Sequence, residues 1–404
     1  MKHAAGTSRR HILRVGAAAI GGGLLAEQKT RALETPGRLG APLGPYGDRS
    51  PFEKAVRWRR ETRTPETGSS FTPLQDSVGT LTPSSLHYER HHAGIPTIDP
   101  ARHRLVIHGL VDRPLSLSVA EIRRLPSVTR IMVLECGGNS SSEWAASTAP
   151  DVQRSFGLVS CSEWTGVPLS LLLAEVGVRP GASWVIAEGA DACRMERSIP
   201  LAKALGDSLV AYGQNGEALR PAQGYPLRLL NPGWEGNTSV KWLHSLKLTD
   251  QPYMARDETS KYSDLMPDGK ARIFTYQMEA KSVITFPSGG QTLPGPGPYE
   301  LTGLAWSGRG RIERVEITTD GGKSWVHAKL QEPRLPLAFT RFRLPWRFDG
   351  HEAVIASRAI DESGYIQPSP EALIAVRGTN SVYHFNGMKF WRVRADGTVT
   401  NVEG

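Results

Sequence analysis

The hydrophobic patterning of the chain changes character near residue 255. Before this point, short apolar runs typical of buried strands alternate with helix signals, such as the capping box formed by Ser118 and Glu121. Beyond it the helix signals stop, and strand-like runs follow one another with turn signals such as Asp320-Gly321 between them. This pattern predicts an α+β protein, in which a mixed α/β domain precedes an antiparallel β-sandwich of immunoglobulin type.

The N-terminal residues predict an export signal. Residues 1–33 include TSRRHILRVGAAAIGGGLLA, in which the pair Arg9-Arg10 precedes a Gly/Ala-rich apolar stretch that is too short to span a bilayer. This pattern is typical of a twin-arginine signal, and it indicates a periplasmic protein that folds before export. After it we expect an extended arm, the α/β domain, the sandwich and a short tail, over residues 34–80, 81–252, 253–395 and 396–404.

The net charge does not indicate a nucleic-acid partner. The formal charge is +8, but residues 1–33 hold six Lys or Arg and one acidic residue, so the rest of the chain carries only +3. Those charges are scattered, and no basic run is interleaved with aromatic residues. We therefore exclude nucleic-acid binding, and we expect no membrane span.

The three cysteines, Cys136, Cys161 and Cys193, do not have the spacing of a haem, iron–sulfur or structural zinc site. The sequence leaves open whether Cys161 and Cys193 are buried thiols or form a disulfide. His87 and His91 have the spacing of a zinc pair on one helix face, but the glycine and proline that follow argue against a helix there.

Cys136 ends the apolar run IMVLE, which predicts a buried strand, and Gly137 and Gly138 follow it. A lone cysteine in such a place is most often a small buried hydrophobic residue. Two glycines, however, let the backbone approach a bulky ligand, and they place the thiolate at the carboxyl end of a strand, where α/β sheets build sites. A soft thiolate there would suit a soft metal.

Several motifs around this cysteine resemble, in order and spacing, those of the sulfite oxidase family of molybdenum enzymes. They are HYERHHAGIP (87–96), LECGGN (134–139), SCSEWTGVPL (160–169), AYGQNGEAL (211–219), GYPLRLLNPGWEGNTSVKWL (224–243) and AVRGTN (375–380). MEAKSVITFPSGG and TTDGGKSW resemble the dimerisation domain of that family. Within the family the likeness is greatest to the molybdenum subunit of sulfane dehydrogenases, which act in thiosulfate oxidation.

The resemblance implies a molybdenum-molybdopterin cofactor, with Cys136 as the protein ligand of the metal. It implies catalytic roles for Arg90, Tyr212 and Arg377, which would stabilise charge on the substrate. The residues that it implies for cofactor binding are His92, Asn139, Arg228, Asn237, Ser239 and Lys241. We expect the pterin phosphate to rely most on Lys241, because Thr238 and Ser239 stand where animal members of the family have Arg and His.

One departure from the family bears on the substrate. Animal sulfite oxidases have two arginines directly after the cysteine motif, and this chain has Ser140 and Ser141 there. We therefore expect oxygen-atom transfer to a sulfane sulfur bound to a carrier protein, because fewer cations would hold free sulfite less tightly. The alternatives are a free-sulfite dehydrogenase and a non-enzymatic exported binding protein.

The sequence also bears on partners. Because the chain has no haem motif, electrons would pass to a c-type cytochrome subunit. The C-terminal resemblance further implies a homodimer, here within a hetero-oligomer.

Overall fold

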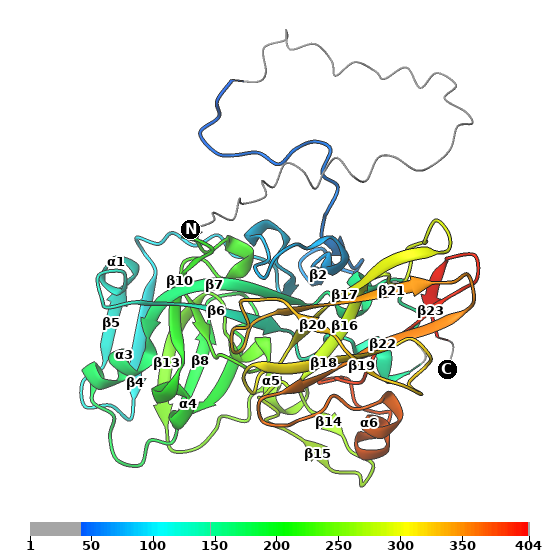
Figure 1. Cartoon of the computed structure of the whole chain (residues 1–404). Coiled ribbons are helices and arrows are strands. Elements are labelled where there is room, and N and C mark those ends of the chain that lie inside the picture. The colour runs from blue at the N-terminus through cyan, green and yellow to red at the C-terminus, as the bar shows by residue number, and fades with distance from the viewer. Residues whose placement is uncertain (1–41, 146, 403–404) are drawn as a thin grey trace, which may run out of the picture. The chain divides into compact units, whose positions relative to one another are not determined.

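The computed structural model describes residues 42–145 and 147–402. The predicted export signal, residues 1–33, lies outside the described residues. Residues 42–54 belong to a first unit and contain no helix or strand, whereas the second unit, Ala55–Gly404, holds all the elements described below (Figure 1). Among the described residues, no helix is long and apolar enough to cross a membrane.

The strand predicted before Cys136 is the edge strand of an antiparallel sheet. The sheet has the order β11-β10-β7-β6, and β12 pairs with β10. Its strands are β6 (Val128–Glu135), β7 (Val159–Pro168), β10 (Leu209–Gln214), β11 (Glu217–Ala218) and β12 (Arg228–Leu230). The last four residues of β6 are buried, as its continuous apolar run predicts, so the chain reaches Cys136 inside the protein.

A second sheet of the first domain has the order β5-β4-β13-β8-β9. Its strands are β4 (Arg104–Gly109), β5 (Leu115–Ser118), β8 (Trp184–Gly189), β9 (Glu196–Pro200) and β13 (Leu243–Thr249). β13 runs parallel to β4, and the other neighbours are antiparallel. Apolar side chains of both sheets and of α3 form one buried cluster, so the first domain has the mixed α/β architecture that the sequence predicts.

The helices of this domain are short. They are α1 (Val119–Ile122), α2 (Val152–Phe156), α3 (Leu169–Val176), α4 (Leu201–Gly206) and α5 (Arg256–Thr259). The predicted capping box at α1 is confirmed: the Glu121 N–H donates to Ser118 Oγ at 3.2 Å, and the Ser118 N–H donates to Glu121 Oε2 at 2.7 Å. α3 begins directly after Pro168.

Short elements connect these parts. The strands are β1 (Trp58–Arg59), β2 (Gly68–Phe71), β3 (Glu89–His91), β14 (Asp264–Leu265) and β15 (Ala271–Arg272). The 3-10 helices are η1 (Leu74–Asp76), η2 (Ser84–Leu86), η3 (Ser141–Trp144), η4 (Pro221–Gln223) and η5 (Gly236–Thr238). β1 and β2 lie within the segment that we expected to be an extended arm, and they form a three-stranded sheet with β3, which holds Arg90.

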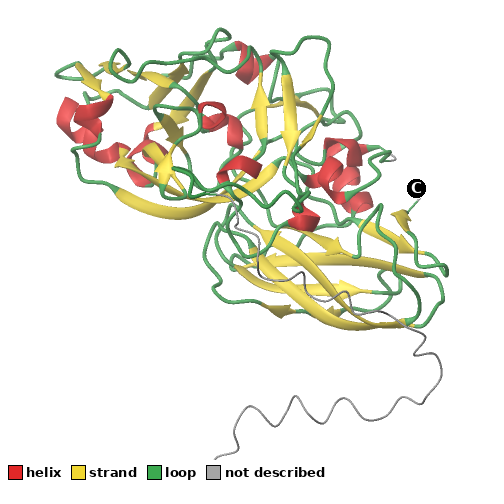
Figure 2. Ribbon diagram, turned by 90° about the horizontal axis from the view of Figure 1, so that it is seen from above, coloured by secondary structure: helices red, strands yellow, loops and turns green. Residues whose placement is uncertain are grey.

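The second domain is the predicted β-sandwich, with antiparallel strand pairs in both sheets (Figure 2). One sheet contains β16 (Lys281–Phe286), β17 (Gly297–Trp306), β20 (Lys329–Leu330) and β21 (Thr340–Phe348). The other contains β18 (Ile312–Thr318), β19 (Val326–His327), β22 (Ala353–Asp361), β23 (Phe390–Val393) and β24 (Val399–Asn401).

The expectation that helices end near residue 255 is wrong. α5 begins at Arg256, and α6, Pro370–Arg377, lies well inside the second domain. The local signal for α6 is present, because Ser369 accepts from the Ala372 N–H and Pro370 occupies the first turn. The helix is short and only Leu373 and Arg377 are buried, so its apolar periodicity is weak.

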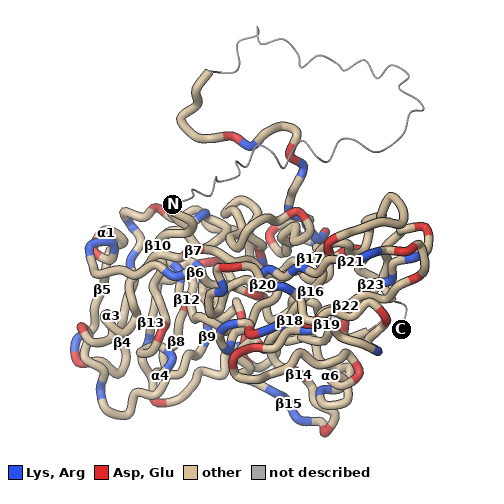
Figure 3. Tube along the Cα trace, viewed as in Figure 1, with Lys and Arg blue, Asp and Glu red and all other residues tan. Residues whose placement is uncertain are grey.

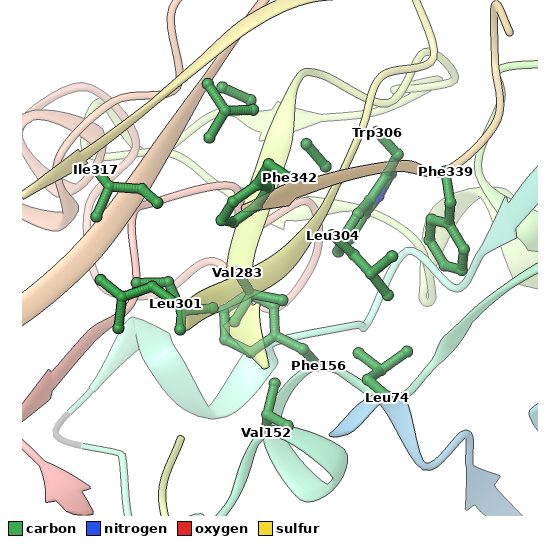
Figure 4. Packing of buried hydrophobic residues seen from close by; sticks show 14 of the residues in the cluster. Leu74, Val152, Phe156, Val283, Leu301, Leu304, Trp306, Ile317, Phe339 and Phe342 are labelled. Carbon is green, nitrogen blue, oxygen red and sulfur yellow. The ribbon is translucent and has the colours of Figure 1, made fainter. Parts of the chain in front are cut away.

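The core of the sandwich continues into the first domain. Val283, Leu301 and Phe342 of the sandwich belong to the same buried cluster as Val152 and Phe156 of α2 (Figure 4). Burial of apolar area is the main stabilising term in folding, so this shared cluster ties the two domains together. Lys and Arg are interspersed with Asp and Glu along the chain, in agreement with the absence of a basic run in the sequence (Figure 3).

Candidate active site

Cys136 lies at a sharp turn after β6, and its side chain is 9% exposed. Its N–H donates to Leu158 O at 2.9 Å, and its carbonyl accepts from the Asn139 N–H at 2.8 Å. Burial raises the pKa of the thiol, so the site favours a neutral thiol unless a cation binds there. A Cβ on Gly137 would lie 2.6 Å from Glu235 Oε2, so a side chain directly after the cysteine would displace this carboxylate.

A pocket opens beside Cys136. Seven of the residues predicted for the site line it: Arg90, His92, Cys136, Arg228, Asn237, Ser239 and Lys241. They come from β3, from the turn after β6, and from the segment β12 to β13, so three distant parts of the sequence meet here. Three predicted residues, Asn139, Tyr212 and Arg377, do not line this pocket.

Two cations of the pocket are Arg228, which is buried, and Lys241, which is partly buried. Lys241 Nζ donates to Arg90 O and to Ala222 O, each at 3.1 Å, and contacts His91 Nδ1 at 2.9 Å. These contacts use all three donors of an ammonium, so Lys241 offers a phosphate its charge rather than a further hydrogen bond. Burial, followed by the charge of Arg228, lowers the pKa of Lys241 to about 7.

Arg228 offers both charge and donors. Its Nε donates to Ser239 O at 3.2 Å, and its Nη1 donates to Gln223 O and Oε1 at 3.2 Å, which leaves Nη2 for a ligand. Burial lowers its pKa to about 10, so it stays charged at neutral pH. Gln223 is a pocket residue that the sequence argument missed, and no periodic signal marks it.

One tyrosine that lines the pocket is Tyr262, and Tyr212 does not line it. Tyr212 lies on β10, where its ring packs on the Arg123 guanidinium at 5.7 Å and against the core of the first domain. Tyr262 lines the pocket instead, and its hydroxyl lies 3.2 Å from His92 Nε2. Tyr262 follows α5 in a polar segment without periodicity, so sequence pattern alone did not distinguish it.

His92 is a neutral partner of this tyrosine. Burial, followed by the charge of Arg90, lowers the pKa of His92 to about 3. Burial raises the pKa of Tyr262 well above its usual value. The pair therefore presents an uncharged imidazole and an intact hydroxyl beside Cys136, groups that donate or accept hydrogen bonds without adding charge.

Asn139 and Arg377 are buried in supporting positions. The Asn139 amide donates to Glu135 Oε1 at 2.9 Å, and its carbonyl accepts from the Leu158 N–H at 3.0 Å, so it holds the turn that carries Cys136. Arg377 ends α6 and donates to Asp264 Oδ2 at 2.7 Å. Its guanidinium is therefore paired with a carboxylate of the same chain instead of facing the pocket.

The other metal and disulfide alternatives are not realised. His87 and His91 lie in extended backbone around β3, so they do not share a helix face. Among residues 42–145 and 147–402, no group of three His, Cys, Asp or Glu side chains could hold a metal ion. Cys161 and Cys193 are free thiols, and Cys193 Sγ donates to Asp191 Oδ2 at 2.7 Å.

The pocket fits a molybdopterin group. Both amide atoms of Asn237 are buried without a hydrogen-bond partner among the described residues, and orphaned groups of this kind need a polar ligand. A Cβ on Gly236 would lie 2.9 Å from the backbone oxygen of Glu135, so glycine lets η5 come this close to the end of β6. Cys136 would hold the metal, and Asn237 and Arg228, with the charge of Lys241, would hold the pterin and its phosphate.

Comparison with known proteins agrees with this arrangement. The oxidoreductase molybdopterin binding domain model matches residues 92–256, and the Mo-co oxidoreductase dimerisation domain model matches residues 272–389. Sulfite oxidase from Gallus gallus is 31% identical over 319 residues, which are 73% of this chain and 69% of that protein. The NADH nitrate reductase from Ulva prolifera is 32% identical over 347 residues, 76% of this chain but 40% of that protein.

One solved structure matches almost the whole chain. It is that of the sulfane dehydrogenase SoxCD from Paracoccus pantotrophus, at 43% identity and a TM-score of 0.88, and the match covers 99% of this chain and 100% of that one. The molybdopterin-binding match overturns the alternative of a non-enzymatic binding protein. The chain therefore belongs to the sulfite oxidase family of molybdenum enzymes, and molybdenum-molybdopterin is its cofactor.

Proposed function

We propose that this protein oxidises a sulfane sulfur attached to a carrier protein and passes the electrons to a c-type cytochrome. The observation that carries this proposal is the likeness over almost the whole chain, at 43% identity, to a protein described as a sulfane dehydrogenase. In each step the sulfur gains one oxygen atom from water, and two protons and two electrons are released. When bound, the cofactor supplies the two-electron redox centre for this oxygen transfer.

The chain's own residues would place the sulfur and hold the charge that develops on it. Arg90 contributes a cation to the pocket that also contains Cys136. The Tyr262 hydroxyl, 3.2 Å from the neutral His92, supplies a donor to a substrate oxygen without the cost of burying a further charge. Burial of the pocket strengthens both interactions, because the local dielectric is low.

The residues after the cysteine support a carrier-bound substrate. Ser140 and Ser141 bring no cation to the pocket, and the buried Arg377 is paired with Asp264. Each charge-assisted hydrogen bond to a free dianion is worth about 1.5–3 kcal/mol, so their loss weakens the binding of free sulfite. A sulfur atom that is attached to a partner protein gains its binding energy from the protein surface instead.

Partners and location follow from the same proposal. No haem motif occurs in the chain, so a separate cytochrome subunit would take the electrons. The dimerisation domain at residues 272–389 favours a homodimer within the hetero-oligomer. The twin-arginine pattern in residues 1–33 favours export to the periplasm after the cofactor has been inserted.

Free sulfite is the second candidate substrate, because a relative that is 31% identical is a sulfite oxidase. Steady-state assays with cytochrome c as acceptor separate the two candidates. We expect turnover with a persulfidated carrier protein, little turnover with free sulfite, and none with the same carrier in its thiol form. High efficiency on free sulfite, with no response to the persulfidated carrier, would replace this proposal by the sulfite alternative.

A matched variant sharpens that assay. Ser141→Arg restores a cation after the cysteine motif, and Ser142→Arg is its control one residue further along η3. We expect Ser141→Arg to move preference toward free sulfite by about 1–2 kcal/mol in relative transition-state binding, and the control to move it less.

A further inference from the structure

A segment of the second domain contacts the residue next to Cys136. We name residues 381–386, which follow α6, the strap. The His384 N–H in the strap donates to the Gly137 carbonyl at 2.8 Å. His384 has a φ of 57°, a left-handed conformation that side-chain-bearing residues adopt only when their surroundings hold them there.

The ring of His384 makes a second contact, with Glu235, the residue before η5. Its Nε2 lies 3.0 Å from Glu235 Oε2, and because a carboxylate only accepts, the imidazole proton is on Nε2. Glu235 is held on its other oxygen by Arg197 Nη2 at 3.1 Å. Glu235 therefore anchors the ring of His384, while the His384 N–H holds the Gly137 carbonyl.

The strap is itself fixed by the pair Arg377 and Asp264. Arg377 Nη1 donates to His384 O at 3.0 Å, and Asp264 Oδ1 accepts from the Val382 N–H at 2.9 Å and the Tyr383 N–H at 3.2 Å. Asp264, Arg377 and His384 are buried, whereas Val382 is exposed, so the ion pair at the base of the strap is the part shielded from water. The paired Arg377 thereby acts on the site through His384.

The residue before Cys136 is held from the second domain as well. Glu135 accepts from Lys281 Nζ of β16 at 2.5 Å and from Trp306 Nε1 of β17 at 2.6 Å. The cysteine therefore lies between two residues whose positions are set by the sandwich and its strap. A backbone held on both sides leaves the thiol little freedom, which is what an exact metal–sulfur geometry requires.

We propose that His384 is a positioning residue for Cys136, and that the strap makes the second domain part of the metal site. This inference rests on the proposed role of Cys136 as metal ligand but not on the identity of the sulfur substrate. Cys136→Ser tests that role separately, so failure of the ligand assignment is distinguishable from failure of the strap.

The test uses the full-length protein with its cofactor bound. His384→Asn keeps a residue that tolerates the left-handed backbone, but its side chain is too short to replace the ring contact with Glu235. The control is His103→Asn, which removes another buried histidine, bonded to Leu243 O at 2.8 Å. The readouts are the thiolate-to-metal absorption band, amide hydrogen exchange over residues 134–140, and the molybdenum-to-pterin ratio.

For His384→Asn we expect at least tenfold faster exchange over residues 134–140, a shifted absorption band at an unchanged molybdenum-to-pterin ratio, and about tenfold lower kcat with KM within about twofold. For His103→Asn we expect none of these changes. An unaltered band and unaltered exchange in His384→Asn would overturn the proposal.

A second variant covers the case in which His384→Asn does not accumulate as folded protein. Asp264→Asn keeps the acceptor for the strap amides but loses the ion pair with Arg377. We expect the same changes in exchange and absorption, but smaller. If amide hydrogen exchange over residues 134–140 is as slow in Asp264→Asn as in the unchanged protein, the proposal is again overturned.

Discussion

The sandwich core and the surroundings of Cys136 are both buried, but they are built from opposite kinds of side chain. Phe342, Trp306 and their neighbours form an apolar cluster that continues into the first domain. Around Cys136, by contrast, Glu135 pairs with Lys281 and Glu235 with Arg197, and all four are about 1% exposed. Apolar burial stabilises a fold, whereas a buried ion pair contributes little net stability because both charges lose their hydration.

The comparison indicates that the two regions have different roles: the sandwich core stabilises the fold, and the charged surroundings of Cys136 set the geometry of the site. Apolar contacts are non-directional, so the sandwich core can hold the domains together without fixing any one atom. Charged hydrogen bonds are directional: that at Glu135 fixes the residue before Cys136, and that at Glu235 fixes His384, whose N–H holds the residue after it. We infer that the core provides the free energy of folding and the charged cluster provides the shape of the site.

The largest expected effect is on stability. Phe342→Ala removes a ring that is fully buried in the sandwich, and it should lower the free energy of unfolding by about 3–5 kcal/mol. Denaturant unfolding measures this change. Activity per folded molecule should stay within about twofold, and a large loss of activity at unchanged stability would break the comparison.

The ion pair should respond differently. Lys281→Met leaves Glu135 buried without its cation, which should cost about 3 kcal/mol or more in the free energy of unfolding. The double variant Glu135→Leu with Lys281→Met removes both charges and should recover at least half of that loss. If the double variant is as unstable as the single one, the pair contributes to stability in its own right.

Cys136→Ser should have its effect on activity alone. A hydroxyl is a harder ligand than a thiolate, so turnover should fall below about 1%. The free energy of unfolding should change by less than about 1 kcal/mol, because the two side chains differ little in size. Near-normal turnover would contradict the ligand assignment.

Two tyrosines provide a matched pair. Tyr262→Phe removes the hydroxyl beside His92 and should lower kcat/KM by about tenfold, the loss of one hydrogen bond in the transition state. Tyr212→Phe changes a ring that packs away from the pocket and should leave kcat/KM within about twofold. The reverse result would restore the prediction made from sequence.

The smallest expected effect concerns pH. Burial lowers the pKa of Lys241 from 10.5 to about 7, so in cofactor-free protein the unfolded state binds more protons between these values. Stability should therefore rise with pH through this window, by at most about 1.4 kcal/mol between pH 7 and pH 8. Below pH 7 this group contributes no pH dependence.

Lys241→Met should abolish that rise, which calorimetry of the cofactor-free proteins over the same pH range can measure. If stability rises with pH as steeply in Lys241→Met as in the unchanged protein, another group causes the rise. Bound phosphate would favour the charged ammonium and move the window to higher pH.

Much of this protein follows from local pattern. The apolar run of β6, the capping box at Ser118 and the spacing of strands beyond residue 255 each depend on neighbouring residues, so they predicted the two domains. Arg90, Cys136 as a metal ligand and the segment Arg228 to Lys241 were instead implied by the resemblance of short motifs to the sulfite oxidase family.

The remainder depends on contacts between distant positions. His92 meets Tyr262 across 170 residues, and Glu235 meets His384 across 149. No periodicity distinguishes Tyr262 from Tyr212 in the sequence; the strand geometry of β10 directs one ring to the core, and the chain after α5 brings the other to the pocket. Which buried polar groups share a site is set by packing between segments, and that arises only when the whole chain has folded.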